Sequence, residues 1–197
     1  MERSRIQQIA DQDVSDSLDR ELRSLLSTCF TRPQDDVFRD RRYWKEPPVH
    51  RWIMRDAGGD MIAHVAAHDK TFAVFPGAGD VSSEEHAFPE ELRVAGIAEV
   101  CVHPAARGMG HVREILGVAH TVLGRMGFHF SALFGNPEVY RSSGYLLVDN
   151  LVRFHDDTEG IEQTMRFDGR QGGAFLRRSL SRSEWPQGVI DIRGPKF

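Results

Sequence analysis

The segment from Leu92 to Met126 limits the fold of this chain more than any other stretch. Residues Leu92–Val102 are mostly apolar and predict a strand, which Gly96 interrupts as glycine does at a bulge. The loop Arg107–Gly110 follows, and the next residues repeat apolar side chains at helical spacing. That helical face carries Ile115, Val118, Ala119, Val122 and Met126. A strand, a glycine-containing loop and a helix in succession indicate an α/β fold.

The length and charge of the chain exclude several classes of protein. Its 197 residues suit one domain, so we expect a single domain over residues 1–197, with residues 155–197 as its C-terminal extension. Charged residues make up 27% and apolar residues 40% of the chain, as in soluble globular proteins. The net charge is −4. Because nucleic-acid binding requires a basic excess, we expect no nucleic-acid partner.

Cysteine content and hydropathy predict a cytoplasmic protein. Cys29 and Cys101 are the only cysteines and lie far apart in the sequence, so no disulfide framework or zinc ribbon is expected. Residues Met1 to Val14 lack the apolar core of a secretory signal, and no window reaches the roughly 20 apolar residues that span a bilayer. We therefore expect no membrane partner.

The remaining periodicities predict alternating short elements. Asp11 and Asp13 are expected to cap a first helix, and residues Trp52 and Met54 alternate with Arg51 and Arg55 as in a half-buried strand. The expected order is a strand at Arg3–Ile9, a helix through Leu18 to Cys29, a short helix through Val37, Arg41 and Trp44, a hairpin over Val49–Phe75, a loop over Pro76–Glu91, strands at Phe128–Phe134 and Tyr145–Phe154 around a short helix at Pro137–Ser142, and a last strand at Val189–Ile192.

The glycine loop is a candidate phosphate site. Free backbone N–H groups and the positive end of a helix dipole meet at such a junction, and Arg107 adds a charged donor. Glycine is also the default residue of an ordinary turn. The nucleotide-hydrolase fingerprint is absent because no lysine lies near, and Arg113 replaces the third glycine of the dinucleotide fingerprint.

Two motifs identify a family resemblance. The string Val102-His-Pro-Ala-Ala-Arg-Gly-Met-Gly110 resembles motif A of the GNAT superfamily of acyl-CoA N-acyltransferases, and Tyr140-Arg-Ser-Ser-Gly-Tyr145 resembles its second signature. The resemblance covers roughly Arg3 to Phe154. It implies an α/β (α+β) GNAT fold, a mixed and mostly antiparallel sheet that is splayed in the middle, with helices on both faces.

The resemblance implies acetyl-CoA, or another acyl-CoA, as co-substrate and no metal. Val112 departs from motif A, which has Gly or Ala there, and its side chain either crowds the diphosphate or lies on the inner face of the helix. The residues assigned to the coenzyme are Cys101, Val102, Arg107, Gly108, Met109, Gly110, His111, Val112 and Asn136.

The resemblance also implies direct attack of an amine on the thioester, without a covalent enzyme intermediate. Backbone N–H groups near Cys101 and Val102 would bind the thioester oxygen where the strand is splayed. Tyr140 is the candidate acid, although a packed core tyrosine is the alternative. Glu99 is the candidate base, with an exposed strand carboxylate as the alternative.

The acceptor is expected to be a primary amine of a small polar molecule. The chain resembles aminoglycoside 2′-N-acetyltransferases around Glu99, Tyr140 and Gly144, and segment 183–191 resembles the end of the nodulation N-acyltransferase; both groups act on amino sugars. Asp191 is therefore a candidate contact for a cationic acceptor, beside an acidic group formed by Asp156, Asp157 and Glu159. A homodimer, an acyl-carrier-protein donor and a coenzyme-binding module without turnover remain open.

Overall fold

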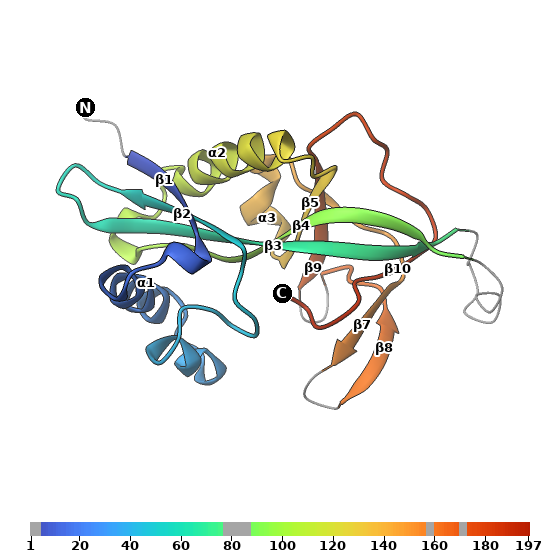
Figure 1. The fold of residues 1–197 in the computed structure, drawn as a ribbon, viewed down its shortest axis with the longest axis horizontal. Coiled ribbons are helices and arrows are strands. Elements are labelled where there is room, and N and C mark those ends of the chain that lie inside the picture. The colour runs from blue at the N-terminus through green and yellow to red at the C-terminus, as the bar shows by residue number, and fades with distance from the viewer. Residues whose placement is uncertain (1–4, 77–87, 157–159, 170–172) are drawn as a thin grey trace. The chain divides into compact units, whose positions relative to one another are not determined.

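The computed structural model describes residues 5–76, 88–156, 160–169 and 173–197, which fold into two compact units (Figure 1). Met1–His68, Ile97–Val122 and Phe197 make up the first unit, and the second contains Asp69–Gly96 and Leu123–Lys196. Strands β3 (Met61–Phe75) and β4 (Glu90–Val102) and helix α2 (His111–Arg125) each contribute residues to both units. The single domain over residues 1–197 stays a prediction. Among the described residues, no helix is both long and apolar enough to cross a bilayer.

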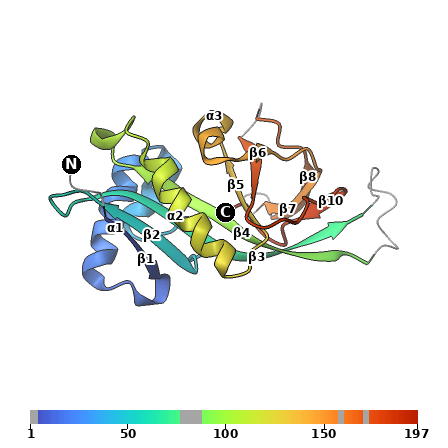
Figure 2. The same ribbon diagram turned by 90° about the horizontal axis from the view of Figure 1, so that it is seen from above.

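An antiparallel sheet flanked by two helices forms the first unit. Strand β2 (His50–Arg55) pairs with β1 (Arg5–Ala10) on one side and with β3 on the other, which confirms the expected hairpin. Helices α1 (Asp16–Cys29) and α2 lie on opposite faces of this sheet (Figures 1 and 2). The buried face of α1 carries Leu22, Leu25 and Leu26.

Three local expectations in the first unit were wrong. Ser15, not an aspartate, caps α1, and its side chain accepts the N–H of Leu18 at 3.3 Å. The second helix is a 3-10 helix over Pro33–Arg39 that ends before Trp44, because the Trp44 N–H is donated to the side chain of Glu99 at 2.7 Å. Arg51 is buried rather than facing solvent.

The second unit is built on β5 (Phe130–Gly135). This strand pairs in parallel with β4 over Val94–Gly96 and antiparallel with β9 (Ala174–Ser179). After β5 come α3 (Pro137–Tyr140), a 3-10 turn at Arg141–Ser143 and β6 (Leu146–Leu147), and β6 pairs with β9. Strands β7 (Val152–Asp156) and β8 (Ile161–Met165) form an antiparallel pair. The last strand, β10 (Val189–Asp191), lies antiparallel to β3 and parallel to β7.

The segment expected as one strand over Tyr145–Phe154 is two strands. Asn150 lies between them, and its side chain donates to the carbonyls of Pro186 and Gly188 at 3.1 and 2.8 Å. Trp185 donates its indole N–H to the Asn150 side chain at 2.9 Å and meets Phe130 edge to face. The chain between β6 and β7 therefore serves as the docking point for the C-terminal segment. Strands β8 and β9 were not predicted.

Gly188 positions the last strand. Its φ is +107°, and a Cβ there would lie 2.2 Å from the carbonyl oxygen of Phe75. Only glycine combines this backbone conformation with so close an approach to β3. The pairing of β10 with β3 depends on it.

We expect Gly188→Ala to lower the free energy of unfolding by about 3 kcal/mol, because left-handed strain adds to the displacement of β10. Gly117→Ala is the matched control, since Gly117 lies within α2 and its Cβ would meet nothing within 4 Å. That substitution should add about 0.5–1 kcal/mol of stability. Urea unfolding of the three proteins measures both values, and equal stability of Gly188→Ala and the wild type would contradict the packing described for β10.

Candidate active site

The backbone of strand β4 is distorted at Glu99, and this distortion is called the bulge below. The φ of Glu99 is +52°, a left-handed conformation that a non-glycine residue rarely adopts inside a strand. Pairing of β4 with β5 covers Val94 to Gly96, and the bulge follows three residues later. Gly96 is thus the last paired residue, while the distortion expected near it lies at Glu99. Backbone strain of about 1–3 kcal/mol at such a position persists only where surrounding contacts hold it.

Past the bulge, the main chain of β4 presents a hydrogen-bond donor on the side away from β3. The His103 N–H donates to the carbonyl of Ile62 on β3 at 2.8 Å. Adjacent residues of a strand direct their N–H groups to opposite sides, so the Val102 N–H points away from β3 and the Cys101 N–H toward it. Binding of a thioester oxygen by the backbone near Cys101 and Val102 stays a prediction.

The glycine loop has the backbone geometry of an anion site. Gly108 and Gly110 have φ of +79° and +81°, and a Cβ on either would meet nothing within 4 Å. Helix α2 begins at His111, directly after the loop, so the N–H groups of its first turn have no partner within the helix. The expected succession of strand, glycine loop and helix is confirmed, and phosphate binding there stays a prediction.

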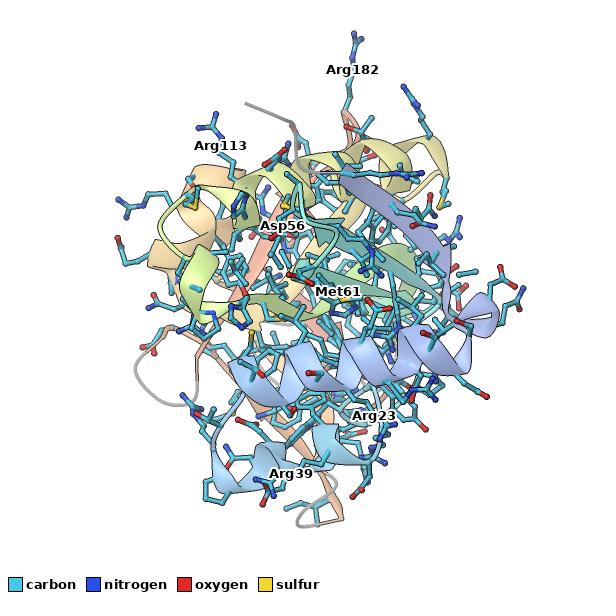
Figure 3. The ribbon with its side chains drawn as sticks, turned by 90° about the vertical axis from the view of Figure 1, so that its left-hand side faces the viewer. Arg23, Arg39, Asp56, Met61, Arg113 and Arg182 are labelled. Atoms are coloured by element: carbon cyan, nitrogen blue, oxygen red, sulfur yellow. The ribbon has the colours of Figure 1, made fainter. Side chains whose placement is uncertain are left out.

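The side chains around the loop differ in direction. Arg107 folds back and donates its Nε–H to the carbonyl of Val102 at 3.2 Å, while Met109 is exposed. His111 and Val112 are half-buried, and the His111 Nδ1 lies 3.5 Å from a carboxylate oxygen of Glu114. Arg113, at the position where a dinucleotide site needs glycine, points outward from α2 (Figure 3).

A buried charge cluster supports the bulge from below. The Arg51 side chain is fully buried, and it donates to Asp11 at 2.5 Å and to Glu99 Oε2 at 3.2 Å. Its Nη1 also lies 3.1 Å from the Nε2 of His64, whose Nδ1 lies 3.1 Å from the Glu99 carbonyl. Arg42 donates to Asp11 from the outer side of the cluster.

Hydrogen-bond chemistry fixes the state of His64. Arginine can only donate, so Nε2 accepts, and Nδ1 must carry the proton that it donates to the Glu99 carbonyl. Burial, followed by the charge of Arg51, lowers the pKa of His64 to about 3. The imidazole is therefore neutral and holds the main chain of the bulge.

The carboxylate of Glu99 points into the protein. Its side chain is 3% exposed, although the residue as a whole is half-buried. Burial raises the pKa of Glu99 to about 7, against the opposing effect of Arg51. The sequence alternative of an exposed strand carboxylate is therefore wrong. Burial would also raise the pKa of Asp11, but its hydrogen bonds from Arg42 and Arg51 outweigh this and lower it.

Tyr140 lies at the end of α3 in the second unit, against Gly135. A Cβ on Gly135 would lie 2.7 Å from the Tyr140 ring, which therefore needs glycine at this place. Its ring meets Tyr145 edge to face, with the centroids 5.8 Å apart. Tyr145 itself is buried and shares a 2.5 Å hydrogen bond with Ser131. Asn136 caps α3 by accepting the N–H of Glu138 at 3.0 Å.

Asp191 already has protein partners. It accepts the Arg193 N–H at 2.7 Å, and its other oxygen lies 4.0 Å from Arg153. Of the acidic group, Asp157 and Glu159 lie outside the described residues. A contact of Asp191 with a cationic acceptor stays a prediction.

Sequence reasoning missed two groupings in the first unit. It placed Arg51 on a solvent-facing side and assigned no role to His64, whereas both support the bulge. It also treated Cys29 and Cys101 as unrelated, whereas their thiols lie close enough to shift each other's pKa. These residues lie on segments far apart in the sequence, so no spacing pattern indicated that they would come together.

Comparison with known proteins agrees with this geometry. A family model for the acetyltransferase (GNAT) domain matches residues 12–148. The GNAT family N-acetyltransferase YhbS from Escherichia coli, solved in complex with CoA, is 19% identical with a TM-score of 0.63, over 97% of this chain and 90% of that chain. An acyl-CoA N-acyltransferase from Pseudomonas aeruginosa is 14% identical with a TM-score of 0.58, over 90% of this chain and 100% of that one.

No curated protein matched the sequence. The structural likenesses, at such identities, bear on the fold alone, and the family model covers more than half of the chain. Motif A occupies a bulged strand, a glycine loop and a helix N-terminus, within a mixed sheet that has helices against it. The chain belongs to the GNAT acetyltransferase family and has its fold.

Proposed function

We propose that this protein transfers an acetyl or other acyl group from its CoA thioester to a primary amine of a small polar acceptor. The observation that carries the proposal is the junction of β4 and α2, where two left-handed glycines stand between the bulged strand and the helix. The E. coli structure with CoA supports coenzyme A as the donor. Resemblance to enzymes of amino sugars supports an amino-sugar acceptor.

The loop would hold the coenzyme through main-chain groups. The N–H groups at the start of α2 and around Gly108 and Gly110 would bind the diphosphate, aided by the dipole of the helix. The open space on both glycines leaves room for phosphate oxygens. Met109, His111, Val112 and Asn136 are proposed as further contacts. The Val102 N–H would then bind the thioester oxygen and stabilise the negative charge that develops on it.

Chemistry would need two proton transfers. The amine nitrogen forms a bond with the carbonyl carbon and loses a proton, which we assign to Glu99 through water. The carbon–sulfur bond breaks, and the leaving thiolate takes a proton from the phenol of Tyr140. A pKa of about 7 suits Glu99 for a base at neutral pH.

Titration with CoA tests the first step. We expect heat on binding and a raised melting temperature, because ligands that bind only the native state stabilise it. Gly110→Ala should weaken binding at least about tenfold, since its Cβ would occupy the space left for phosphate. Gly59→Ala has the same left-handed strain in a distant hairpin turn, with nothing within 4 Å of its Cβ, and should bind as the wild type does. Absence of heat and of thermal protection in the wild type would refute the proposal.

Tyr140→Phe should lower kcat about a hundredfold while the Kd for CoA changes little, because the substitution removes only the acidic proton. Release of the coenzyme thiol in the presence of an amine panel measures turnover. The phenylalanine ring keeps the packing against Gly135 and Tyr145. Equal turnover of the two proteins would remove Tyr140 from the chemistry.

Glu99→Gln keeps an oxygen for the Trp44 N–H but cannot take a proton. We expect wild-type kcat/KM to rise with pH through about 7 as Glu99 ionises, and the variant to be slower and to lack this inflection. If Glu99 only positions the bulge, the variant will keep most of its kcat at every pH.

The same pair of proteins tests the shifted pKa without substrate. The folded-state pKa of Glu99 lies above its value of 4.5 in an unfolded chain, so the folded state binds the extra proton between these pH values. Wild-type stability should therefore fall by up to about 3 kcal/mol relative to Glu99→Gln as pH rises from about 4.5 to about 7. Glu91→Gln, on the exposed end of β4, is the control, and its stability should change with pH as that of the wild type does. If the stability of all three proteins changes with pH in the same way, the raised pKa of Glu99 is contradicted.

A further inference from the structure

Two thiols meet beside the glycine loop. Cys29 is the last residue of α1, and Cys101 lies two residues after the bulge of β4. Both are free cysteines, and Cys29 packs against the apolar cluster of Leu25, Leu26 and Phe38 to which Cys101 belongs. The two thiols lie close enough to shift each other's pKa. The function proposed above uses neither side chain.

Arg107 joins the thiol pair to the loop. Its Nε–H donates to the carbonyl of Val102, next to Cys101, and its guanidinium charge acts on Cys29. The hydrogen bond from Cys101, followed by the effects of Arg107, lowers the pKa of Cys29 although burial opposes this. The hydrogen bond to Cys29 and burial raise the pKa of Cys101. Of the two thiols, Cys29 is therefore the one that loses its proton more readily, and the cation adds to this effect.

The two sulfurs differ in access. Cys29 is half-buried at the end of a helix, whereas Cys101 is 6% exposed. A half-buried thiol of lowered pKa with a second thiol beside it is the arrangement in which oxidation proceeds to a disulfide rather than to higher oxides. A small oxidant would meet Cys29 first.

We propose that Cys29 and Cys101 are an oxidation site, which peroxide converts to an intramolecular disulfide next to the glycine loop. The Cys29 thiolate attacks one peroxide oxygen, the O–O bond breaks, and hydroxide leaves to become water after taking a proton. The Cys101 sulfur then attacks the Cys29 sulfenic acid, forming the S–S bond and breaking the S–O bond, and its proton leaves with that oxygen as water. Two thiols lose two electrons to one peroxide, which yields two waters.

The disulfide alters the loop through Arg107. Oxidation removes the thiolate that faces the guanidinium and draws the end of α1 to β4, one residue before Val102. The oxidised protein will bind coenzyme A more weakly, a consequence that rests on the proposed function. Formation of the disulfide itself requires no coenzyme.

The test uses the full chain without ligand, reduced and then treated with hydrogen peroxide. The expected result is loss of both free thiols in the monomer, a mass lower by two hydrogen atoms, and full recovery with dithiothreitol. A thiol titration and an intact mass measurement give these values. Persistence of both thiols, oxidation of Cys29 to sulfinic acid with Cys101 still free, or a disulfide between two chains would each overturn the proposal.

Variants separate the two sulfurs and the cation. Cys101→Ala should stop at a Cys29 sulfenic acid that dimedone traps, and Cys29→Ser should leave Cys101 unreacted. Arg107→Met should slow oxidation several-fold and move its pH dependence upward, while Arg107→Lys, which keeps the charge, should remain close to the wild type. Equal rates and pH profiles for Arg107→Met and the wild type would contradict the role of Arg107.

Activity gives a separate readout. Cys29→Ser should turn over normally and resist peroxide, whereas the wild type should lose coenzyme affinity on oxidation and regain it on reduction. Disulfide formation with unchanged coenzyme affinity would overturn the link to the loop. If coenzyme A fails to bind the reduced protein at all, the function proposed above falls while the thiol measurements still decide the oxidation site.

Discussion

The buried charge of Arg51 is the constraint on which the first unit depends. A guanidinium with no exposure is stable only if its partners replace water, and here Asp11 comes from the turn after β1, Glu99 from β4 and His64 from β3. Removal of one partner from such a group costs about 3–5 kcal/mol because a charge remains unpaired. One side chain on β2 thus joins β3, β4 and the turn after β1, and its own Nη2 has no hydrogen-bond partner among the described residues.

This cluster explains how a strained bulge can persist at Glu99. The carboxylate accepts from Arg51 and from the Trp44 N–H, and the carbonyl of the same residue accepts from His64. Glu99 is thus held through both its carboxylate and its carbonyl, and in the residues that follow the Val102 N–H points away from β3. The burial that fixes this geometry also raises the pKa of Glu99 toward neutrality, so position and proton affinity have one physical origin.

The sequence predicted those elements whose structure depends on neighbouring residues, such as glycine loops and amphipathic helices. Two glycines before an amphipathic helix located the loop at Gly108–Gly110, and leucine spacing located α1. Period-two alternation placed Arg51 outside, because that rule assumes that a charged side chain has no partner inside. The contacts of Asp11, Glu99 and Cys29 join segments far apart in sequence, and no spacing rule reports on them. The short strands β8 and β9 were not predicted because they lack long apolar runs.

The two tyrosines of the second signature, Tyr140 and Tyr145, have different surroundings in the structure. Tyr145 is buried, its hydroxyl is bonded to Ser131, and burial raises its pKa, so its proton is held inside the second unit. Tyr140 is half-buried, and its ring orientation is set by the missing side chain of Gly135 and by the face of Tyr145. The buried tyrosine therefore packs against the other and orients it, and of the two only Tyr140 combines an oriented ring with partial exposure, which supports it as the proposed acid.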